Sequence, residues 1–484
     1  MQSPQSPITY NERGWSCLDQ ADLIPSSIST LSTRPSDAMS RRTITKSVLL
    51  IGLLVHLGCA RQPEIASNDH TASHQPKSQS QIPSKNKSLQ VLRRGNTTKI
   101  NWSTARVDPK QLAKAIQLAT SYLNEACQPS GQFTYCVHQD KTQEIKPEYN
   151  ILRHAGTLYA LEMSYERSPD SRTREVLLKA ARFLRKETLA PLEKQPDLLA
   201  IWSLPEMNHS GQPAQAKLGG AGLGLVALVG LEQIHPGFSE LEELRGLASF
   251  VRSMQRPDGS FYSKYFRTTG PDATWHSLYY PGEAALGLLN LYKIDADERW
   301  LQAASAALSF LAKSQQQSPS VRPDHWMLLA AKQLKPILER DNSHELRADL
   351  MQHVRRTCKR MAEDQRPFLS NPLLRGCFVE DGRTTPTSIR LEGLLAALNI
   401  LDPNDYRLEQ QLDEVVAYGI QYLLRCQVQS GPLQGGIPCA ISFIPTGDAV
   451  DDAELKRRAG EIRIDYVQHA LSAMIQYEQW ITRE

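Results

Sequence analysis

The chain has 484 residues, with 55 Lys and Arg against 52 Asp and Glu and a formal net charge of +3. This near balance is unlike the strongly basic composition of nucleic-acid-binding domains, so we expect no nucleic-acid partner. Hydrophobic residues make up 40% of the chain, which is enough for a sizeable core in one large domain or several small ones.

Residues 39–59 have the layout of an export signal. A basic stretch (residues 40–46, SRRTITK) precedes a short apolar run (48–57), which ends in Gly58-Cys59. The run is too short for a permanent membrane span. The segment resembles a bacterial lipoprotein signal with Cys59 as the lipidated first residue, although His56 stands where that pattern usually has Leu. The basic stretch also resembles a twin-arginine signal. We predict a cell-envelope protein, lipid-anchored at the periplasmic face or outer membrane, or otherwise secreted.

Two segments flank this signal. Met39 gives a signal of ordinary length, which makes residues 1–38 a candidate for a misassigned start. Residues 60–105 are rich in Ser, Gln, Asn and Lys without apolar periodicity, a composition that predicts a disordered tether. We expect the folded domain to span residues 106–484.

Six cysteines fall within the predicted domain. An even number in an exported chain favours disulfides. Pairing in sequence order would close the loop inside each of three helical hairpins, and buried free thiols are the alternative. None has the C-x-x-C spacing of a zinc site. The six are Cys127, Cys136, Cys358, Cys377, Cys426 and Cys439.

Helical periodicity recurs in alternating segments of two kinds. The first kind has apolar residues at three-and-four spacing with polar residues between, as expected of a half-buried helix. These segments are 108–126, 170–188, 238–254, 296–315, 344–364 and 407–426. The second kind is more apolar, in places on all sides, which predicts burial. These segments are 149–166, 217–233, 281–294, 323–338, 386–401 and 461–479. The alternation predicts an all-α fold, an (α/α)6 toroid of inner and outer helices preceded by a disordered N-terminal segment.

The inner helices begin with polar, ionisable residues, and a toroid would place all six beginnings at one end. Charged groups gathered at the mouth of an apolar barrel predict a binding or catalytic site. Long connections inside the hairpins support this prediction, because long ordered loops are commonly functional.

This pattern resembles the six-hairpin (α/α)6 toroid superfamily, which includes glycoside hydrolases, polysaccharide lyases and sugar epimerases. Residues 149–154 (YNILRH) are distantly similar to a Tyr-Arg-His segment of uronate epimerases. Residues 255–261 (QRPDGSF) resemble the Gln…Gly-aromatic repeat of terpene cyclase and prenyltransferase toroids. The Asp-x-Asp-Asp motif of that second group is only approximated by residues 448–452 (DAVDD). The first resemblance implies a carbohydrate substrate or ligand.

Candidate catalytic residues follow from two chemistries. Glycoside hydrolysis uses a pair of carboxyl groups, whereas a histidine could abstract a proton alpha to a uronate carboxylate held by arginine. Asp465 and His469 are four residues apart and share a helix face, so the acid could orient the imidazole; an ion pair to a neighbouring helix is the alternative. The catalytic candidates are Glu283, Asp324, His325, Asp465 and His469. An acid in the first turn of a helix, such as Asp324, could instead stabilise the helix as a cap.

Candidate substrate-binding residues are the remaining polar groups of the helix beginnings: Tyr149, Arg153, His154, Lys217, Tyr280, Arg390, Glu392 and Arg463. A metal site from His154, His325 and His469 is conceivable, but their spacing is unrelated to known motifs. We therefore predict neither a metal nor a cofactor. The sequence favours an exported enzyme that hydrolyses, eliminates or epimerises an acidic, uronate-containing glycan. The alternatives are a terpenoid-cyclase-like toroid with an apolar cavity and a non-catalytic lipoprotein that docks glycan or protein.

Overall fold

A computed structural model describes residues 107–209 and 211–483. The predicted signal, tether and lipidated Cys59 lie outside the described residues. Within the described part of the chain, no helix is both long and apolar enough to cross a membrane.

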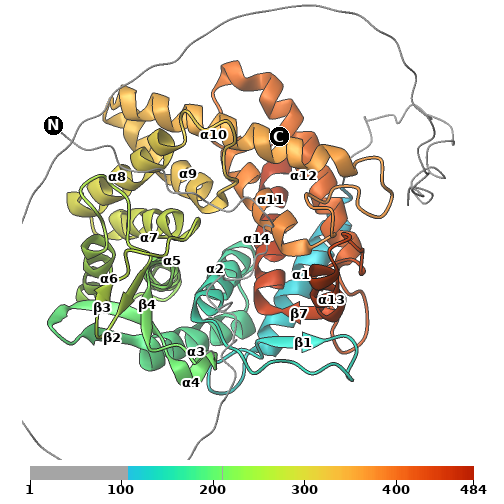
Figure 1. Ribbon diagram of the computed structural model, residues 1–484, viewed down its shortest axis with the longest axis horizontal. Coiled ribbons are helices and arrows are strands. Elements are labelled where there is room, and N and C mark those ends of the chain that lie inside the picture. The colour runs from blue at the N-terminus through green and yellow to red at the C-terminus, as the bar shows by residue number, and fades with distance from the viewer. Residues whose placement is uncertain (1–106, 210, 484) are drawn as a thin grey trace, which may run out of the picture. The chain divides into compact units, whose positions relative to one another are not determined.

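Twelve long helices form two concentric rings (Figure 1). Each inner helix contacts the next, and the last contacts the first, which closes the ring. The inner helices are α2 Ile151–Arg167, α5 Leu218–Ile234, α7 Tyr280–Ile294, α9 His325–Arg340, α11 Thr384–Leu398 and α14 Ile464–Ile481. The outer helices are α1 Pro109–Ala126, α3 Ser171–Thr188, α6 Leu241–Ser253, α8 Glu298–Ser314, α10 His344–Gln365 and α12 Tyr406–Cys426. The predicted (α/α)6 toroid is confirmed.

The hydrophobic pattern explains which helices form which ring. In α5 nearly every residue from Leu218 to Leu231 is buried, and α11 is buried along its whole length. An outer helix such as α8 buries one stripe, which includes Trp300, Leu308 and Leu311. A helix with one apolar stripe can cover a core only from outside, whereas an all-apolar helix needs neighbours on every side.

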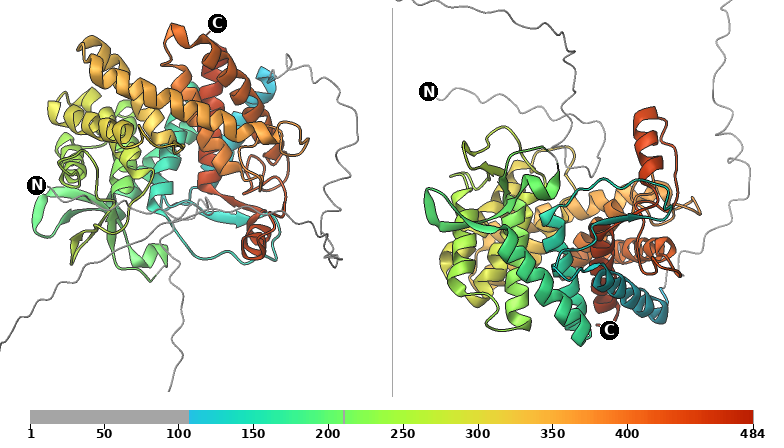
Figure 2. Two further views of the ribbon diagram at one scale, coloured as in Figure 1. Left: turned by 45° about the horizontal axis from the view of Figure 1, so that its top comes forward. Right: turned by 90° about the horizontal axis from the view of Figure 1, so that it is seen from below.

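The connections contain short strands, which the all-α prediction does not include. Five strands form an antiparallel sheet in chain order: β2 Leu189–Leu192, β3 Gln195–Ser203, β4 Gln215–Lys217, β5 Lys264–Phe266 and β6 Gly270–Pro271. In addition, β1 Cys136–His138 pairs with β7 Glu461–Arg463, with Val137 opposite Ile462. This second pairing joins the first hairpin to the last. The strands lie on one side of the ring (Figure 2, right). The connections also contain two short α-helices, α4 Pro205–Asn208 and α13 Ala449–Arg458, and two 3-10 helices, Arg366–Phe368 and Pro403–Asp405.

A repeated glutamine and glycine device fastens neighbouring outer helices to one another. The Gln255, Gln365 and Gln427 side-chain amides each donate a 2.9 Å hydrogen bond to a backbone carbonyl of the next outer helix, at Ala303, Val415 and Ala115 respectively. The bond from Gln427 joins α12 to α1 and so closes the outer ring. Near these three glutamines, Gly259, Gly376 and Gly435 approach the same neighbouring helices at positive φ. The Gln…Gly-aromatic segment 255–261 therefore has a bracing role.

The predicted disulfides are wrong, because all six cysteines of the described domain are free thiols. For the predicted pair Cys358 and Cys377, the physical reason is that the two thiols lie in separate environments. Cys358 lies on the core face of α10, whereas the Cys377 Sγ lies 3.4 Å from the Thr387 hydroxyl of α11. Burial raises the pKa of the Cys358 thiol to about 12 and that of Cys136 to about 12.

Candidate active site

The inner-helix beginnings lie at one end of the ring, and contacts join three pairs of neighbours there. The Asp465 carboxylate of α14 is paired with Arg153 of α2. The Tyr279 and His325 rings join the beginnings of α7 and α9, with centroids 5.4 Å apart. Gly219 of α5 has no room for a Cβ, because the Glu283 carboxylate and the Tyr280 ring of α7 cover it. Polar residues of neighbouring helix beginnings are therefore in contact at this end, which we call the mouth.

Three titratable side chains from three inner helices converge at the centre of this end. The Glu392 Oε2 of α11 lies 2.7 Å from the His469 Nδ1 of α14 and 3.8 Å from the His325 Nε2 of α9. The two imidazole rings face each other edge to face, with centroids 5.6 Å apart. Glu392 and His325 side chains are 0% and 2% exposed, and His469 is 12% exposed. His469 is thus the most exposed member of the cluster.

The surroundings of His325 keep its imidazole neutral. Burial, together with the neighbouring His469 and Arg390, lowers the pKa of His325 well below its ordinary value. Tyr279 and Trp326 pack against the ring, with the Trp326 centroid 4.7 Å away. A neutral imidazole has a free nitrogen lone pair, so His325 can accept a proton or bind a cation.

Asp465 is bound by arginines, which corrects the predicted Asp465–His469 pair. The Arg463 Nε and Nη2 donate to the two Asp465 oxygens at 2.6 and 2.9 Å, and the Arg153 Nε lies 3.2 Å from Oδ2. Although burial opposes the effect, Arg463 and Arg153 lower the pKa of Asp465 well below its ordinary value. Two fixed guanidinium groups attract a carboxylate more strongly than one imidazole does, so His469 instead bonds to Glu392.

Tyr149 and His154 belong to the core, which corrects their assignment to substrate binding. The His154 Nδ1 lies 2.7 Å from the Tyr149 hydroxyl, and its Nε2 lies 2.9 Å from the Ala180 carbonyl. The ring is fully buried and packs between Phe133 and Phe183. Burial lowers the pKa of His154 to about 4. His154 therefore braces α2 against α3, and it does not join His325 and His469.

The other predicted residues lie at or near the beginnings of the inner helices, and one of them caps its helix. Asp324 caps α9 by accepting a hydrogen bond from the Met327 amide at 3.1 Å, and burial raises its pKa to about 7. Arg390 contacts the Asp364 carboxylate and the Pro386 carbonyl. Lys217 lies at the end of β4, directly before α5, and Glu283 and Tyr280 begin α7.

The sequence predicts a substrate-binding role for Glu392, and it gives no signal for Tyr135 or Gln468. Glu392 lies in an otherwise apolar part of α11, two turns after its first residue, and a lone acid in a fully buried helix was the available signal. Tyr135, whose hydroxyl accepts a hydrogen bond from Arg153, lies in a connection before β1 and had no periodic signal. The Gln468 amide lies 3.3 Å from the His469 Nδ1.

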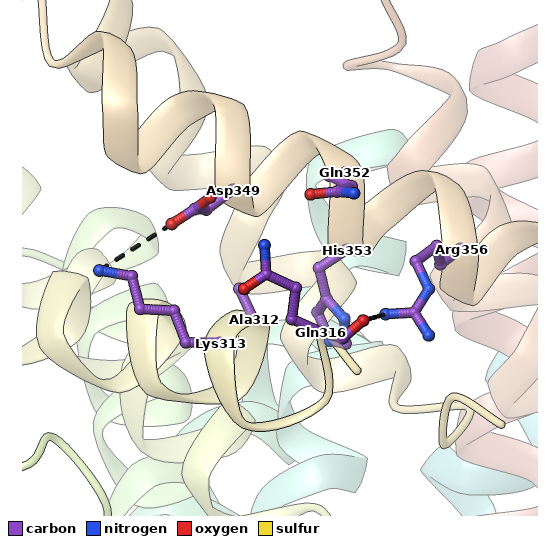
Figure 3. A pocket seen from close by; sticks show the side chains of 7 residues that line it. All are labelled: Ala312, Lys313, Gln316, Asp349, Gln352, His353 and Arg356. Carbon is purple, nitrogen blue, oxygen red and sulfur yellow. Dashed lines mark hydrogen bonds and ion pairs between the residues drawn. The ribbon is translucent and has the colours of Figure 1, made fainter. Parts of the chain in front are cut away.

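Two cavities elsewhere in the described domain have other linings. A small pocket of about 10 Å³ lies between α8 and α10, where Lys313 and Asp349 form a 3.9 Å ion pair and Arg356 donates to the Gln316 carbonyl (Figure 3). A larger pocket of about 180 Å³ lies against the five-stranded sheet, lined by Trp202, Tyr265 and Arg267 among others. The Arg267 guanidinium stacks over Trp202 there at 4.5 Å.

Comparison with known proteins reveals similarity in structure only. No protein-family model matches the chain, and no curated protein matches it. The cellobiose 2-epimerase of Spirochaeta thermophila is 14% identical, covering 80% of this chain and 100% of its own with a TM-score of 0.54. The cellobiose 2-epimerase of Bacillus thermoamylovorans is 10% identical, covering 77% and 99% with a TM-score of 0.54. A possible GH105 family member from Salmonella enterica is 13% identical, covering 83% and 100% with a TM-score of 0.51. The chain therefore has the (α/α)6 toroid fold that these glycoside hydrolase-like and epimerase structures share.

Proposed function

We propose that the chain is a carbohydrate-active enzyme that transfers a proton at a sugar carbon, in an epimerase or isomerase reaction. The observation that carries this proposal is the placement of two imidazoles, His325 and His469, on either side of one carboxylate at the toroid mouth. Two of the similar structures named above are cellobiose 2-epimerases, and the same fold therefore supports a reaction of this class.

Each residue has a defined part in the proposed reaction. Neutral His325 accepts the proton from a carbon next to a carbonyl or carboxylate, and the electron pair moves onto that group's oxygen as an enolate forms. His469, held by Glu392, donates a proton to the opposite face of the carbon, and the enolate oxygen releases its electron pair. The stereochemistry inverts, and the two histidines exchange protonation states.

The charge of the mouth favours an anionic sugar. Arg153 and Arg463 both contact the carboxylate of Asp465, so two guanidinium groups lie side by side at this position. The Arg153 side chain is 19% exposed, so a substrate carboxylate could approach it. A uronate-containing glycan is therefore the proposed substrate class. From the signal-like segment 39–59, we also propose that the protein is exported to the cell envelope.

Hydrolysis is the second candidate function. Its supporting observation is Asp324, whose pKa of about 7 suits a general acid near neutral pH. It has weaker support, because Asp324 caps α9 and because Asp465, one of its predicted partners, is bound by two arginines. The charged mouth gives no support to a terpenoid-cyclase-like cavity.

Proton NMR in deuterated water tests the proposal. The full chain is incubated with uronate oligosaccharides and with neutral reducing disaccharides, and we expect deuterium at the carbon that changes configuration. His325→Gln and His469→Gln should each slow exchange by about 10²–10⁴-fold, whereas exposed His344→Gln should not. New reducing ends without deuterium would favour hydrolysis, and an unchanged spectrum with saturable glycan binding would favour the docking alternative.

A further inference from the structure

The cluster that faces the mouth also has the composition of a metal site. His325, Glu392 and His469 each offer one ligand atom, and these three atoms all lie within 4.8 Å of one another. Imidazole nitrogen and carboxylate oxygen are ligands that Zn²⁺ prefers, and two histidines with one carboxylate leave a fourth position open.

Unsatisfied polar atoms point to a missing partner in the same place. Among the described residues, neither nitrogen of His325 nor the Glu392 Oε1 has a hydrogen-bond partner. Both side chains are almost completely buried. Buried polar groups are ordinarily hydrogen-bonded or bound to a metal, so these unsatisfied atoms on two neighbouring side chains require an explanation.

The distances fit a metal ion after small side-chain movements. Zinc bonds of about 2.0–2.2 Å in a tetrahedron place neighbouring ligand atoms roughly 3.3–3.5 Å apart. The Glu392 oxygen is 3.8 Å from the His325 nitrogen and 2.7 Å from the His469 nitrogen. The nearby cation Arg390 is directed at Asp364 and the Pro386 carbonyl.

We propose that His325, Glu392 and His469 bind one divalent transition-metal ion, with Zn²⁺ as the best match, and that this ion blocks the catalytic centre. An imidazole nitrogen that coordinates a metal cannot accept or donate a proton, so bound metal and proton transfer exclude each other. The inhibition rests on the proposed function, whereas the binding itself does not.

The binding is tested without substrate. Chelator-treated, untagged full chain is titrated with ZnCl₂ by calorimetry, and we expect one ion per chain. Glu392→Gln, His325→Asn and His469→Gln should each weaken binding by at least about tenfold, since even the outer partners of metal ligands contribute about 10–100-fold. His344→Gln, which removes an exposed histidine outside the cluster, should bind as the wild type does.

The free cysteines require a second readout. Co²⁺ bound at the proposed site has no thiolate ligand, so its spectrum should lack sulfur-to-cobalt charge transfer. Equal Zn²⁺ binding by the wild type and all three variants, a thiolate spectrum, or no binding at all would overturn the proposal. Loss of binding in the folded His325→Asn variant would support it even if Glu392→Gln failed to fold. If Zn²⁺ binds but sugar turnover is never observed, the metal site stands and the proposed function fails.

Discussion

The Arg153 Nε of the first inner helix lies 3.2 Å from the Asp465 Oδ2 of the last, so an ion pair closes the toroid at its mouth. Arg463 binds the same carboxylate through two further hydrogen bonds. A buried carboxylate held by two arginines is expected to be structurally important, because removing it leaves two cations without compensation.

Asp465→Asn should therefore destabilise the fold. Loss of one partner from a buried ion pair costs about 3–5 kcal/mol, and we expect a reduction of that size in the free energy of unfolding measured in urea. Asp297→Asn, which removes an ion pair with Arg299 on the surface, is the control and should change little. Equal effects of the two substitutions would contradict a closing role for Asp465.

The helices and their ring order were predictable from the sequence, because periodicity and burial depend on local composition. The predicted inner helix 217–233, for example, differs from α5 by one residue at each end. Most strands have two to four residues and carry little periodic signal, and the nine-residue β3 was also not predicted. The sequence also indicated that the helix beginnings would meet, since alternating hairpins bring them to one end.

Pairings within the mouth could not be read from the sequence. Spacing allowed Asp465 to contact His469, but it contained no information that Arg153 of a distant helix would reach the same carboxylate. Similarly, the bond between Glu392 and His469 depends on how α11 and α14 are rotated about their axes. The rotation of each helix is set by packing among all six inner helices, so it cannot be deduced from the sequence pattern of one helix.

Tyr149→Phe should reduce stability and leave catalysis unchanged. The substitution removes the hydroxyl that bonds to His154 and accepts from the Phe133 amide, and unsatisfied buried groups cost about 1–3 kcal/mol. Tyr135→Phe is a matched comparison, because its ring lies 5.3 Å from Tyr149 but its hydroxyl contacts Arg153. We expect only Tyr135→Phe to raise KM in the exchange assay. A raised KM for Tyr149→Phe would restore its predicted role in substrate binding.

Gly435→Ala should be much more damaging than Gly237→Ala. Both glycines have positive φ, at 88° and 84°, so the backbone strain introduced by alanine is similar. A Cβ at Gly435 would lie 2.0 Å from the Leu118 carbonyl of α1, whereas one at Gly237 would meet nothing within 4 Å. The difference in melting temperature between the two variants therefore reports how much stability is lost when the close contact between Gly435 and α1 is disrupted. Overpacking of this kind costs about 1–3 kcal/mol, and equal melting temperatures would show that the contact is unimportant.

Asp324→Asn should stabilise the protein increasingly as pH rises. The native pKa of about 7 lies above the ordinary value of 3.8, because burial disfavours the charged form. Between these values the unfolded state has lost the proton that the native state keeps, so wild-type stability falls as pH rises from about 4 to 7 and stays low above pH 7. Asparagine cannot ionise and still caps the helix. We expect the two proteins to be similar in urea denaturation at pH 4–5 and the variant to be more stable at pH 8. Asp170→Asn, which changes an exposed N-cap of α3, is the control. A constant difference between wild type and Asp324→Asn across this range would show that Asp324 is ionised in the native protein, which would also remove its support as a general acid.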